Sequence, residues 1–278
     1  NDINEEDGNE VNNESNNEEG NNADNGGGNE NVDEKKKLDF GRELWISNGE
    51  TSGKSLLIDI NPGAASSSPS NFSTIGTKTY FSADNGRHGE ELWMSDGTSE
   101  GTIRLTDINK GSKNSSPRDI SEGPDGIYFS AIQDKVGREL WRLNGDNQSA
   151  TRIVTAGKGK KKLRALDDSN DEFRFELASQ FGKAKADRIT GFNPDEGDQL
   201  ALSGEAFPEL SEINLVTVSS GRQLKAQQKQ LSNLIYYEAK GKLYFNQNGA
   251  EQGFGEEGGL FAVLMGQPDL TESSFLII

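Results

Sequence analysis

The side chains able to do acid–base or nucleophilic chemistry are of few kinds in this sequence. Its 278 residues include 46 Asp and Glu but only one histidine and no cysteine. A Ser-His-Asp system could use only His88 as its base, and sites with two histidine ligands or a thiolate are excluded. His88 lies in the stretch DNGRHGEE, Asp84–Glu91, whose turn residues predict a solvated loop side chain.

Pairs of carboxylates are the remaining catalytic option, because glycoside hydrolysis needs only two of them across a cleft. Asp59 and Asp107 each precede an isoleucine and lie 48 residues apart in matching sequence. A residue that recurs in this way indicates a role in each copy of a repeat, not in one unique active site. We also find no glycine-rich phosphate loop between a strand and a helix. The sequence therefore predicts a protein without catalytic turnover.

Calcium is the one cofactor that the acidic turns allow, since calcium prefers several oxygen ligands. Asp84 and Asp96 are candidate ligands because both lie in turn sequences. Asp96 is aligned with Asn48 and Asn144 in the neighbouring repeats, and each of the three precedes a glycine. Interchange of Asp and Asn favours a turn role for Asp96 over a charge role.

The strongest pattern is an internal repeat of 48 residues. GRELW ending at Trp45 is followed by GEELW ending at Trp93 and by GRELW ending at Trp141. Each tryptophan is followed three residues later by Asn-Gly or Asp-Gly, pairs that suit a tight hairpin turn. Short apolar runs such as SLLIDI and KTYFSA complete each copy, so about four strands fit one period.

A four-stranded unit of this length is typical of a β-propeller blade, which buries its faces only against neighbouring blades. We therefore predict a mainly β fold with propeller-like repeats over residues 38–155, in which Trp45, Trp93 and Trp141 are structural anchors in the core. The segments ELWISNGETSGK and ELWMSDGTSEGT resemble the ELWxxDGT repeats of bacterial extracellular proteins. Three blades are fewer than a closed propeller needs. Either further sequence before Asn1 completes a ring, or the units form an open arc.

Two segments outside the repeats are defined by charge. Residues 1–37 contain twelve acidic and three basic residues, which supply −9 of the net charge of −17, and no aromatic residue. They predict a disordered acidic leader. Residues 156–164 include Lys158, Lys160, Lys161, Lys162 and Arg164 and predict a basic linker. The acidity of the whole chain argues against nucleic-acid partners.

The remaining residues, 165–278, predict a compact β-rich domain with one short helix within Gly221–Asn233 and a hairpin from Asn233 whose turn lies near Lys240-Gly241. SNDEFRF at Ser169–Phe175 resembles the last turn of a calcium-binding RTX-type nonapeptide repeat, and ADRITGFNPDEGDQLALS at Ala186–Ser203 is similar to the segment that closes RTX-type domains. Asp167 and Ser169 stand where the nonapeptide has glycines. The domain as a whole resembles the bluetail domain of cyanobacterial surface proteins. The resemblance implies that Asp171 is a calcium ligand.

The chain ends in the apolar residues Phe275, Leu276, Ile277 and Ile278. They are similar to the uncleaved C-terminal signals of substrates of ABC-type exporters, which implies such an exporter as a partner. The alternative is a purely structural role, as a β-strand paired at a sheet edge. No apolar run reaches membrane-spanning length and no signal peptide opens the sequence.

Together these features predict a non-enzymatic extracellular or cell-surface protein with a structural or interaction role. A carbohydrate-binding or carbohydrate-cleaving propeller with a glycan partner, and a calcium-dependent adhesion module, are the alternatives.

Overall fold

A computed structural model describes residues 2–7, 39–50, 53–145, 149–167, 169–177 and 181–278. The described chain is built of β-sheets with a single short α-helix, so the predicted mainly β class is confirmed. The chain divides into two compact units, residues 1–121 and 122–278, and we describe each by itself.

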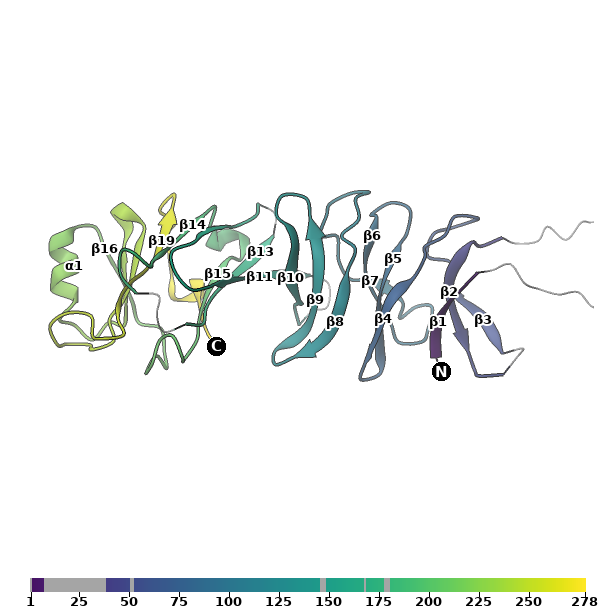
Figure 1. The fold of residues 1–278 in the computed structure, drawn as a ribbon, viewed down its shortest axis with the longest axis horizontal. Coiled ribbons are helices and arrows are strands. Elements are labelled where there is room, and N and C mark those ends of the chain that lie inside the picture. The colour runs from purple at the N-terminus through teal and green to yellow at the C-terminus, as the bar shows by residue number, and fades with distance from the viewer. Residues whose placement is uncertain (1, 8–38, 51–52, 146–148, 168, 178–180) are drawn as a thin grey trace, which may run out of the picture. The chain divides into compact units, whose positions relative to one another are not determined.

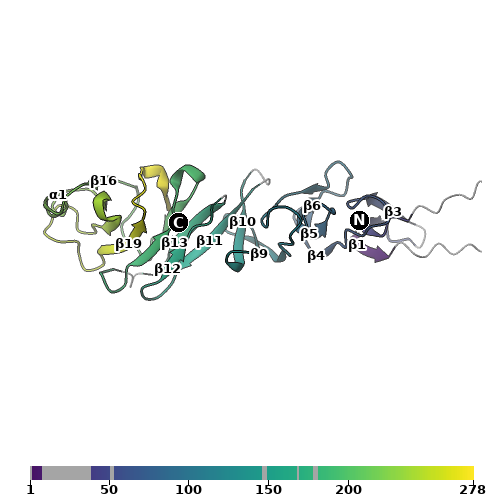
Figure 2. The same cartoon turned by 90° about the horizontal axis from the view of Figure 1, so that it is seen from above.

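Unit 1 holds two antiparallel sheets, which lie side by side in both views (Figures 1 and 2). The first has the order β1-β2-β3 and the second the order β4-β5-β6-β7. The strands are β1 (Asp2–Asp7), β2 (Arg42–Ser47), β3 (Lys54–Ile58), β4 (Ser70–Ile75), β5 (Lys78–Asp84), β6 (Glu90–Ser95) and β7 (Ile103–Arg104).

The core of unit 1 joins two successive repeats. Leu44 and Ile60 of the first repeat form one buried cluster with Phe81, Ala83 and Trp93 of the second. The inner strand β5 is buried along almost its whole length, on both faces, as expected for a sheet covered on both sides. The first and second repeats therefore complete one core together. The closed or open arrangement of the blades stays a prediction.

In the first two repeats, the glutamate before Leu-Trp holds the long loop in place. Glu43 is fully buried and accepts hydrogen bonds from the backbone N–H of Ile60 at 2.8 Å and from the hydroxyl of Ser67 at 2.6 Å. Glu91, 48 residues later, accepts from the hydroxyl of Thr106 at 2.7 Å and from the backbone N–H of Ile108 at 3.1 Å. Burial raises the pKa of both carboxyls.

The glycine that opens the GEELW motif lets this loop approach closely. Gly89 has a φ of +67°, and a Cβ there would lie 2.4 Å from the carbonyl oxygen of Lys113. Gly41 is in the same situation against Ala65. Any other residue at either position would combine a disfavoured backbone conformation with a backbone clash.

Unit 2 begins within β8 and contains two sheets, of orders β20-β15-β13-β11-β10-β9-β8 and β12-β14-β19-β18-β17-β16. The strands are β8 (Arg118–Gly123), β9 (Gly126–Gln133), β10 (Gly137–Leu143), β11 (Ala150–Ala156), β12 (Lys162–Arg164), β13 (Asn170–Phe175), β14 (Asp187–Thr190), β15 (Gln199–Leu202), β16 (Leu215–Val218), β17 (Leu234–Tyr237), β18 (Lys242–Phe245), β19 (Gly259–Met265) and β20 (Phe275–Ile277). The helices are α1 (Gly221–Gln227) and the 3₁₀ turns η1 (Pro194–Glu196), η2 (Glu238–Lys240) and η3 (Glu272–Ser274).

From β11 to β15, successive strands alternate between the two sheets of unit 2. β11, β13, β15 and β20 pair in parallel in one sheet, while β12, β14 and β19 pair in parallel in the other. We call this two-sheet coil the roll. Its apolar core takes side chains from both sheets, among them Phe173, Phe175, Ile189, Phe261 and Leu264.

The third repeat departs from the first two because it leads into the roll. Its last strand, β11, pairs in parallel with β13, so the repeat and the C-terminal domain share one sheet. Glu139 is only half-buried, and nothing lies within 4 Å of a Cβ placed on Gly137. Leu140 is 44% exposed, whereas its equivalents Leu44 and Leu92 are fully buried.

Several segment boundaries differ from those expected from the sequence. The compact units divide at residues 121 and 122, not at the predicted linker 156–164. Within that linker, Lys162–Arg164 form β12, because parallel pairing with β14 satisfies their backbone groups. Asp2–Asp7 of the predicted disordered leader form β1 through antiparallel pairing with β2, and residues 8–38 lie outside the described residues.

Two local predictions for the C-terminal region are confirmed. The helix expected within Gly221–Asn233 is α1, which lies beside β16 in both views (Figures 1 and 2) and begins at Ser220 with a capping box completed by Gln223. The turn expected near Lys240-Gly241 separates the antiparallel strands β17 and β18.

The apolar C-terminus is an edge strand of the roll. β20 pairs in parallel with β15, and Phe275 is buried while Ile277 and Ile278 are 40% and 43% exposed. The alternative of a strand at a sheet edge is thereby confirmed. Recognition of these residues by an exporter stays a prediction.

The buried glutamates should contribute strongly to stability. We expect Glu91→Ala to lower the free energy of unfolding of unit 1 by about 3 kcal/mol, because Thr106 and Ile108 lose their buried acceptor. The exposed Glu100→Ala is the matched control and should change it by less than about 0.5 kcal/mol. Urea unfolding followed by tryptophan fluorescence measures both, and equal effects would contradict the role assigned to Glu91.

Candidate functional site

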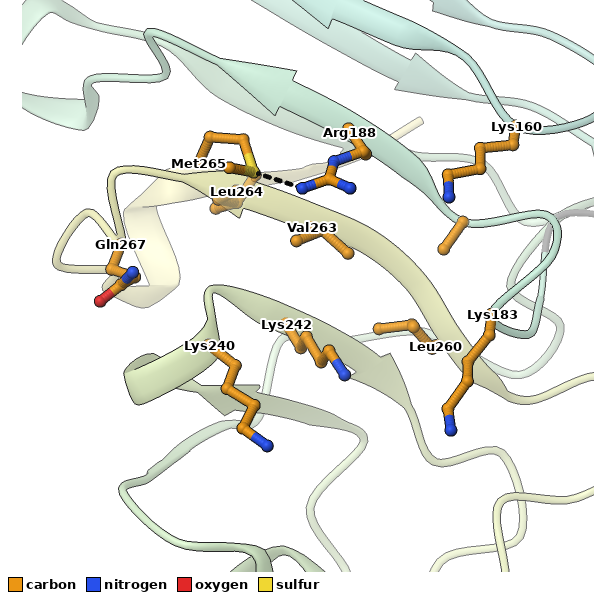
Figure 3. A pocket seen from close by; sticks show the side chains of 11 residues that line it. Lys160, Lys183, Arg188, Lys240, Lys242, Leu260, Val263, Leu264, Met265 and Gln267 are labelled. Atoms are coloured by element: carbon orange, nitrogen blue, oxygen red, sulfur yellow. Dashed lines mark hydrogen bonds between the residues drawn. The ribbon is translucent and has the colours of Figure 1, made fainter.

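Unit 2 contains a basic groove (Figure 3). Its volume is about 310 Å³. Five of its lining side chains are cationic, which is unusual in a protein of net charge −17. The lining residues are Lys160, Lys183, Ala186, Arg188, Lys240, Lys242, Leu260, Val263, Leu264, Met265 and Gln267.

Strand pairing in the second sheet sets the spacing of the cations. Val263 of β19 lies opposite Arg188 of β14 on one side and opposite Lys242 of β18 on the other. Directly paired residues share a face of a sheet, so the three side chains form one row with a cation at each end. Strands are spaced by about 4.8 Å, which places the Cα atoms of the two cationic residues about 10 Å apart. Figure 3 shows Arg188 and Lys242 on opposite sides of β19.

Two short segments bring further lysines to this row. The buried carboxylate of Asp187 accepts a hydrogen bond from the backbone N–H of Lys161 at 2.6 Å, which fixes the chain beside Lys160. Gly241, between Lys240 and Lys242, has a φ of +60°, and a Cβ there would lie 2.0 Å from the carbonyl oxygen of Leu264. Only glycine therefore allows the chain between the two lysines to approach β19 this closely.

The positive charge of the groove is not neutralised by carboxylates. No acidic side chain lines it, and within the described part of the chain none of its five cationic side chains has an ion pair closer than 4.0 Å. Arg188 donates to the sulfur of Met265 at 3.3 Å, and the ammonium group of Lys240 lies 5.5 Å from the ring centre of Tyr237. Clustered like charges without counter-charges repel one another, and a bound anion would relieve this repulsion.

The floor of the groove is aliphatic. Leu260 is buried, Val263 is half-buried and Met265 is 40% exposed. The lining contains no histidine, carboxylate or hydroxyl side chain that could act as a base or nucleophile. The groove therefore offers ammonium and guanidinium groups above an apolar floor.

Sequence reasoning identified only one edge of this site. Lys160 belongs to the predicted basic linker, but Lys183, Arg188, Lys240 and Lys242 come from segments up to 82 positions away in the sequence. The short motif Lys-Gly-Lys at 240–242 was the one available signal. Pairing of β14 and β18 on either side of β19 could not be read from local sequence.

The calcium candidate Asp171 lies in a buried network of charges. One carboxylate oxygen of Asp171 accepts from Arg152 at 2.6 Å and the other from the backbone N–H of Leu166 at 2.6 Å. Its own backbone N–H donates to the buried carboxylate of Asp198 at 2.9 Å. Both Asp171 oxygens therefore have protein donors, and its calcium ligation stays a prediction.

Asp84 and Asp96 act as turn residues. Asp84 accepts from the backbone N–H of Gly86 at 2.7 Å, and Asp96 accepts from the backbone N–H of Thr98 at 2.9 Å. Hydrogen bonds from the hydroxyl and the backbone N–H of Thr98 lower the pKa of Asp96. Among the described residues, no three Asp, Glu or His side chains converge on a point suited to a metal ion.

The structure separates the other predicted site residues. His88 is half-buried in the loop between β5 and β6, where its ring lies 3.1 Å from the side chain of Asn85. Asp59 accepts from the backbone N–H of Gly63 at 3.1 Å, a contact within its own repeat.

The three tryptophans occupy one position of the repeat. Trp93 and Trp141 are 7% and 2% exposed and lie opposite Phe81 and Phe129 on the neighbouring strands. Trp45 lies opposite Asn4 and is only half-buried. Trp93 and Trp141 are therefore buried and Trp45 is not, and the anchoring role of the three stays a prediction.

Comparison with known proteins finds no matching family model, no matching curated protein and no matching solved structure. The resemblance to ELWxxDGT repeats and to the bluetail domain accordingly stays a prediction. Within the described residues, no helix has the length and apolar character needed to span a membrane.

The buried Asp198 predicts a pH dependence of stability. Burial and the neighbouring carboxylates raise its pKa from the ordinary 3.8 to about 7. Between these values the folded chain retains a proton that the unfolded chain releases, so the free energy of unfolding should fall as pH rises from about 4 to about 7 and then level off.

The substitution Asp198→Asn should remove this part of the slope, because the amide does not titrate. Asp195→Asn, at a neighbouring exposed position, is the matched control and should keep the slope. Urea titrations at several pH values measure the effect. The assignment is wrong if the Asp198 and Asp195 variants show the same pH profile.

Proposed function

We propose that this protein is a non-enzymatic interaction protein of the cell surface or the extracellular space, which binds an acidic polysaccharide in the basic groove of unit 2. The observation that carries the proposal is the row Arg188–Val263–Lys242, with three further lysines around it and no carboxylate in the lining. The repeats of unit 1 serve as a scaffold in this proposal, because their recurring polar residues are engaged in loop and turn contacts.

The net charge makes the groove selective. Most of the chain repels polyanions, so binding requires the local concentration of cations that the groove supplies. Two cations about 10 Å apart suit a chain with regularly spaced carboxylate or sulfate groups better than a single small anion. A linear polymer can meet both ends of the row at once, and this second contact raises its apparent affinity.

The aliphatic floor favours a sugar polymer over single-stranded nucleic acid. Proteins that bind single strands present aromatic side chains on which bases stack. No aromatic side chain lines this groove, and Leu260, Val263 and Met265 offer flat apolar contact of the kind that the C–H faces of sugar rings can meet.

The groove can be tested with a fluorescently labelled alginate oligomer, a linear polymer of uronic acids. We expect the wild-type chain to bind it at low salt and to release it as salt is raised. The double variant Arg188→Gln/Lys242→Gln should bind about tenfold more weakly, since each surface cation contributes up to about 1 kcal/mol.

The double variant Lys225→Gln/Lys229→Gln is the matched control, because it removes the same charge in and after α1, outside the groove. It should retain wild-type affinity. Neutral dextran tests whether binding requires a charged polymer. A single-stranded oligonucleotide tests whether the groove prefers nucleic acid to an acidic polysaccharide. Equal loss in both double variants, or tighter binding of the oligonucleotide, would contradict the proposal.

Export through the C-terminus is the second element of the proposal, and it is supported by the apolar residues that end the chain. Ile277 and Ile278 are partly exposed at the edge strand β20, whereas Phe275 belongs to the core. The exposed pair can therefore be changed while the core is kept.

We expect Ile277→Ser/Ile278→Ser to reduce export to the medium or cell surface, measured as the exported fraction of the total protein. Unchanged thermal stability of the purified variant confirms that the fold is intact. The exposed pair Leu140→Ser/Leu231→Ser, outside the groove, is the control for loss of surface hydrophobicity. Wild-type export of the isoleucine variant would rule out a role of these two residues in the signal.

A further inference from the structure

The strand β1 pairs with β2 at the position that β5 occupies beside β6 in the second repeat. In the second repeat, β5 pairs with β6 in a register that sets Thr79 opposite Ser95 and Phe81 opposite Trp93. β1 pairs with β2 in the same register, with Asp2 opposite Ser47 and Asn4 opposite Trp45. Since Ser47 and Trp45 are the repeat equivalents of Ser95 and Trp93, β1 stands where a β5-type strand belongs.

The sequence of β1 lacks what a β5-type strand contributes. In β5 the side chains of Tyr80, Phe81 and Ala83 are almost fully buried. In β9 of the third repeat, Phe129 and Ala131 are fully buried at the same positions. β1 reads DINEED and has Asn4 at the phenylalanine position and Glu6 at the alanine position.

The acceptor strand is already built for an apolar partner. Glu43 and Leu44 of β2 are fully buried, as are their equivalents Glu91 and Leu92 in β6. Trp45 is the exception, since it is only half-buried opposite Asn4, whereas Trp93 is 7% exposed opposite Phe81.

At the distance expected for the first repeat, the sequence does not resemble the β4–β5 hairpin. The hairpin spans Ser70–Asp84, and 48 residues earlier the sequence is NADNGGGNENVDEKK, Asn22–Lys36, which has no aromatic residue. This stretch lies outside the described residues.

We propose that the edge of β2 is an acceptor site for a repeat-type β-hairpin carried by another polypeptide, and that β1 is a weak stand-in for that hairpin. The partner is defined by chemistry: an extended strand with the pattern Tyr-Phe-x-Ala of residues 80–83, preceded by a strand like β4. Backbone hydrogen bonds supply the affinity of such strand addition, and the alternate side chains supply specificity. A second copy of this chain is a poor donor, because its β5 is already paired between β4 and β6.

The proposal can be tested with a synthetic peptide of the sequence Ser70–Asp84 added to the full chain. We expect saturable binding by fluorescence anisotropy, accompanied by a blue shift of the tryptophan emission as Trp45 becomes buried. A peptide with Tyr80→Asp and Phe81→Asp should not bind, because it cannot fill the apolar positions.

Two full-chain variants decide whether β1 and the peptide compete for one site. Asn4→Pro removes a backbone donor from β1 and weakens its pairing, so the peptide should bind about tenfold more tightly. Ile3→Cys/Ile46→Cys joins two directly opposed residues, and in its oxidised form it should exclude the peptide until the disulfide is reduced.

Each outcome bears on the acceptor edge alone, because the basic groove lies in unit 2 and is unchanged in both variants. Binding to the oxidised variant as strong as to the reduced one would overturn the proposal. So would the absence of binding to the Asn4→Pro chain, or equal binding of the two peptides.

Discussion

The fold depends on the fact that a β-sheet with two apolar faces must be covered on both. β5 and β6 carry large apolar side chains on both faces, and Leu44 and Ile60 of the preceding repeat complete the core on the face of Phe81 and Trp93. The buried glutamates follow from the same constraint. A loop that runs from one covered sheet to the next is partly buried, so its polar groups lose their hydrogen bonds to water. Glu43 and Glu91 supply acceptors for its backbone and hydroxyl groups.

Local sequence was sufficient for those features that recur or that depend on turn residues. The 48-residue spacing of the GRELW and GEELW motifs predicted the strands around Trp93 and Trp141 and the turn role of Asp96. The helix at Gly221–Gln227 and the turn at Lys240-Gly241 were also predictable, because a capping residue and a glycine mark them directly. The disordered reading of the leader failed for Asp2–Asp7, since pairing with β2 outweighs the low strand propensity of DINEED.

The basic groove and the sheet shared by the third repeat and the roll could not be predicted, because both arise from pairing between distant segments. Arg188 and Lys242 look like ordinary surface cations in the sequence, and only the two strands that flank β19 place them in one row. Lys162–Arg164 look like part of a linker, but parallel pairing with β14 makes them a strand. The resemblance that suggested calcium at Asp171 does not predict its ion pair with Arg152, because Arg152 belongs to the third repeat.

The shared sheet of the third repeat and the roll makes one end of the repeat array different from the other. β11 pairs in parallel with β13, a seam that occurs once among the described strands and needs a strand unlike β7 of the preceding repeat. Whole units of 48 residues could be gained or lost on the N-terminal side of this seam while the pairing of β11 with β13 is kept. Length variation in this architecture is therefore one-sided, and the third repeat and the roll should be inherited together as one module.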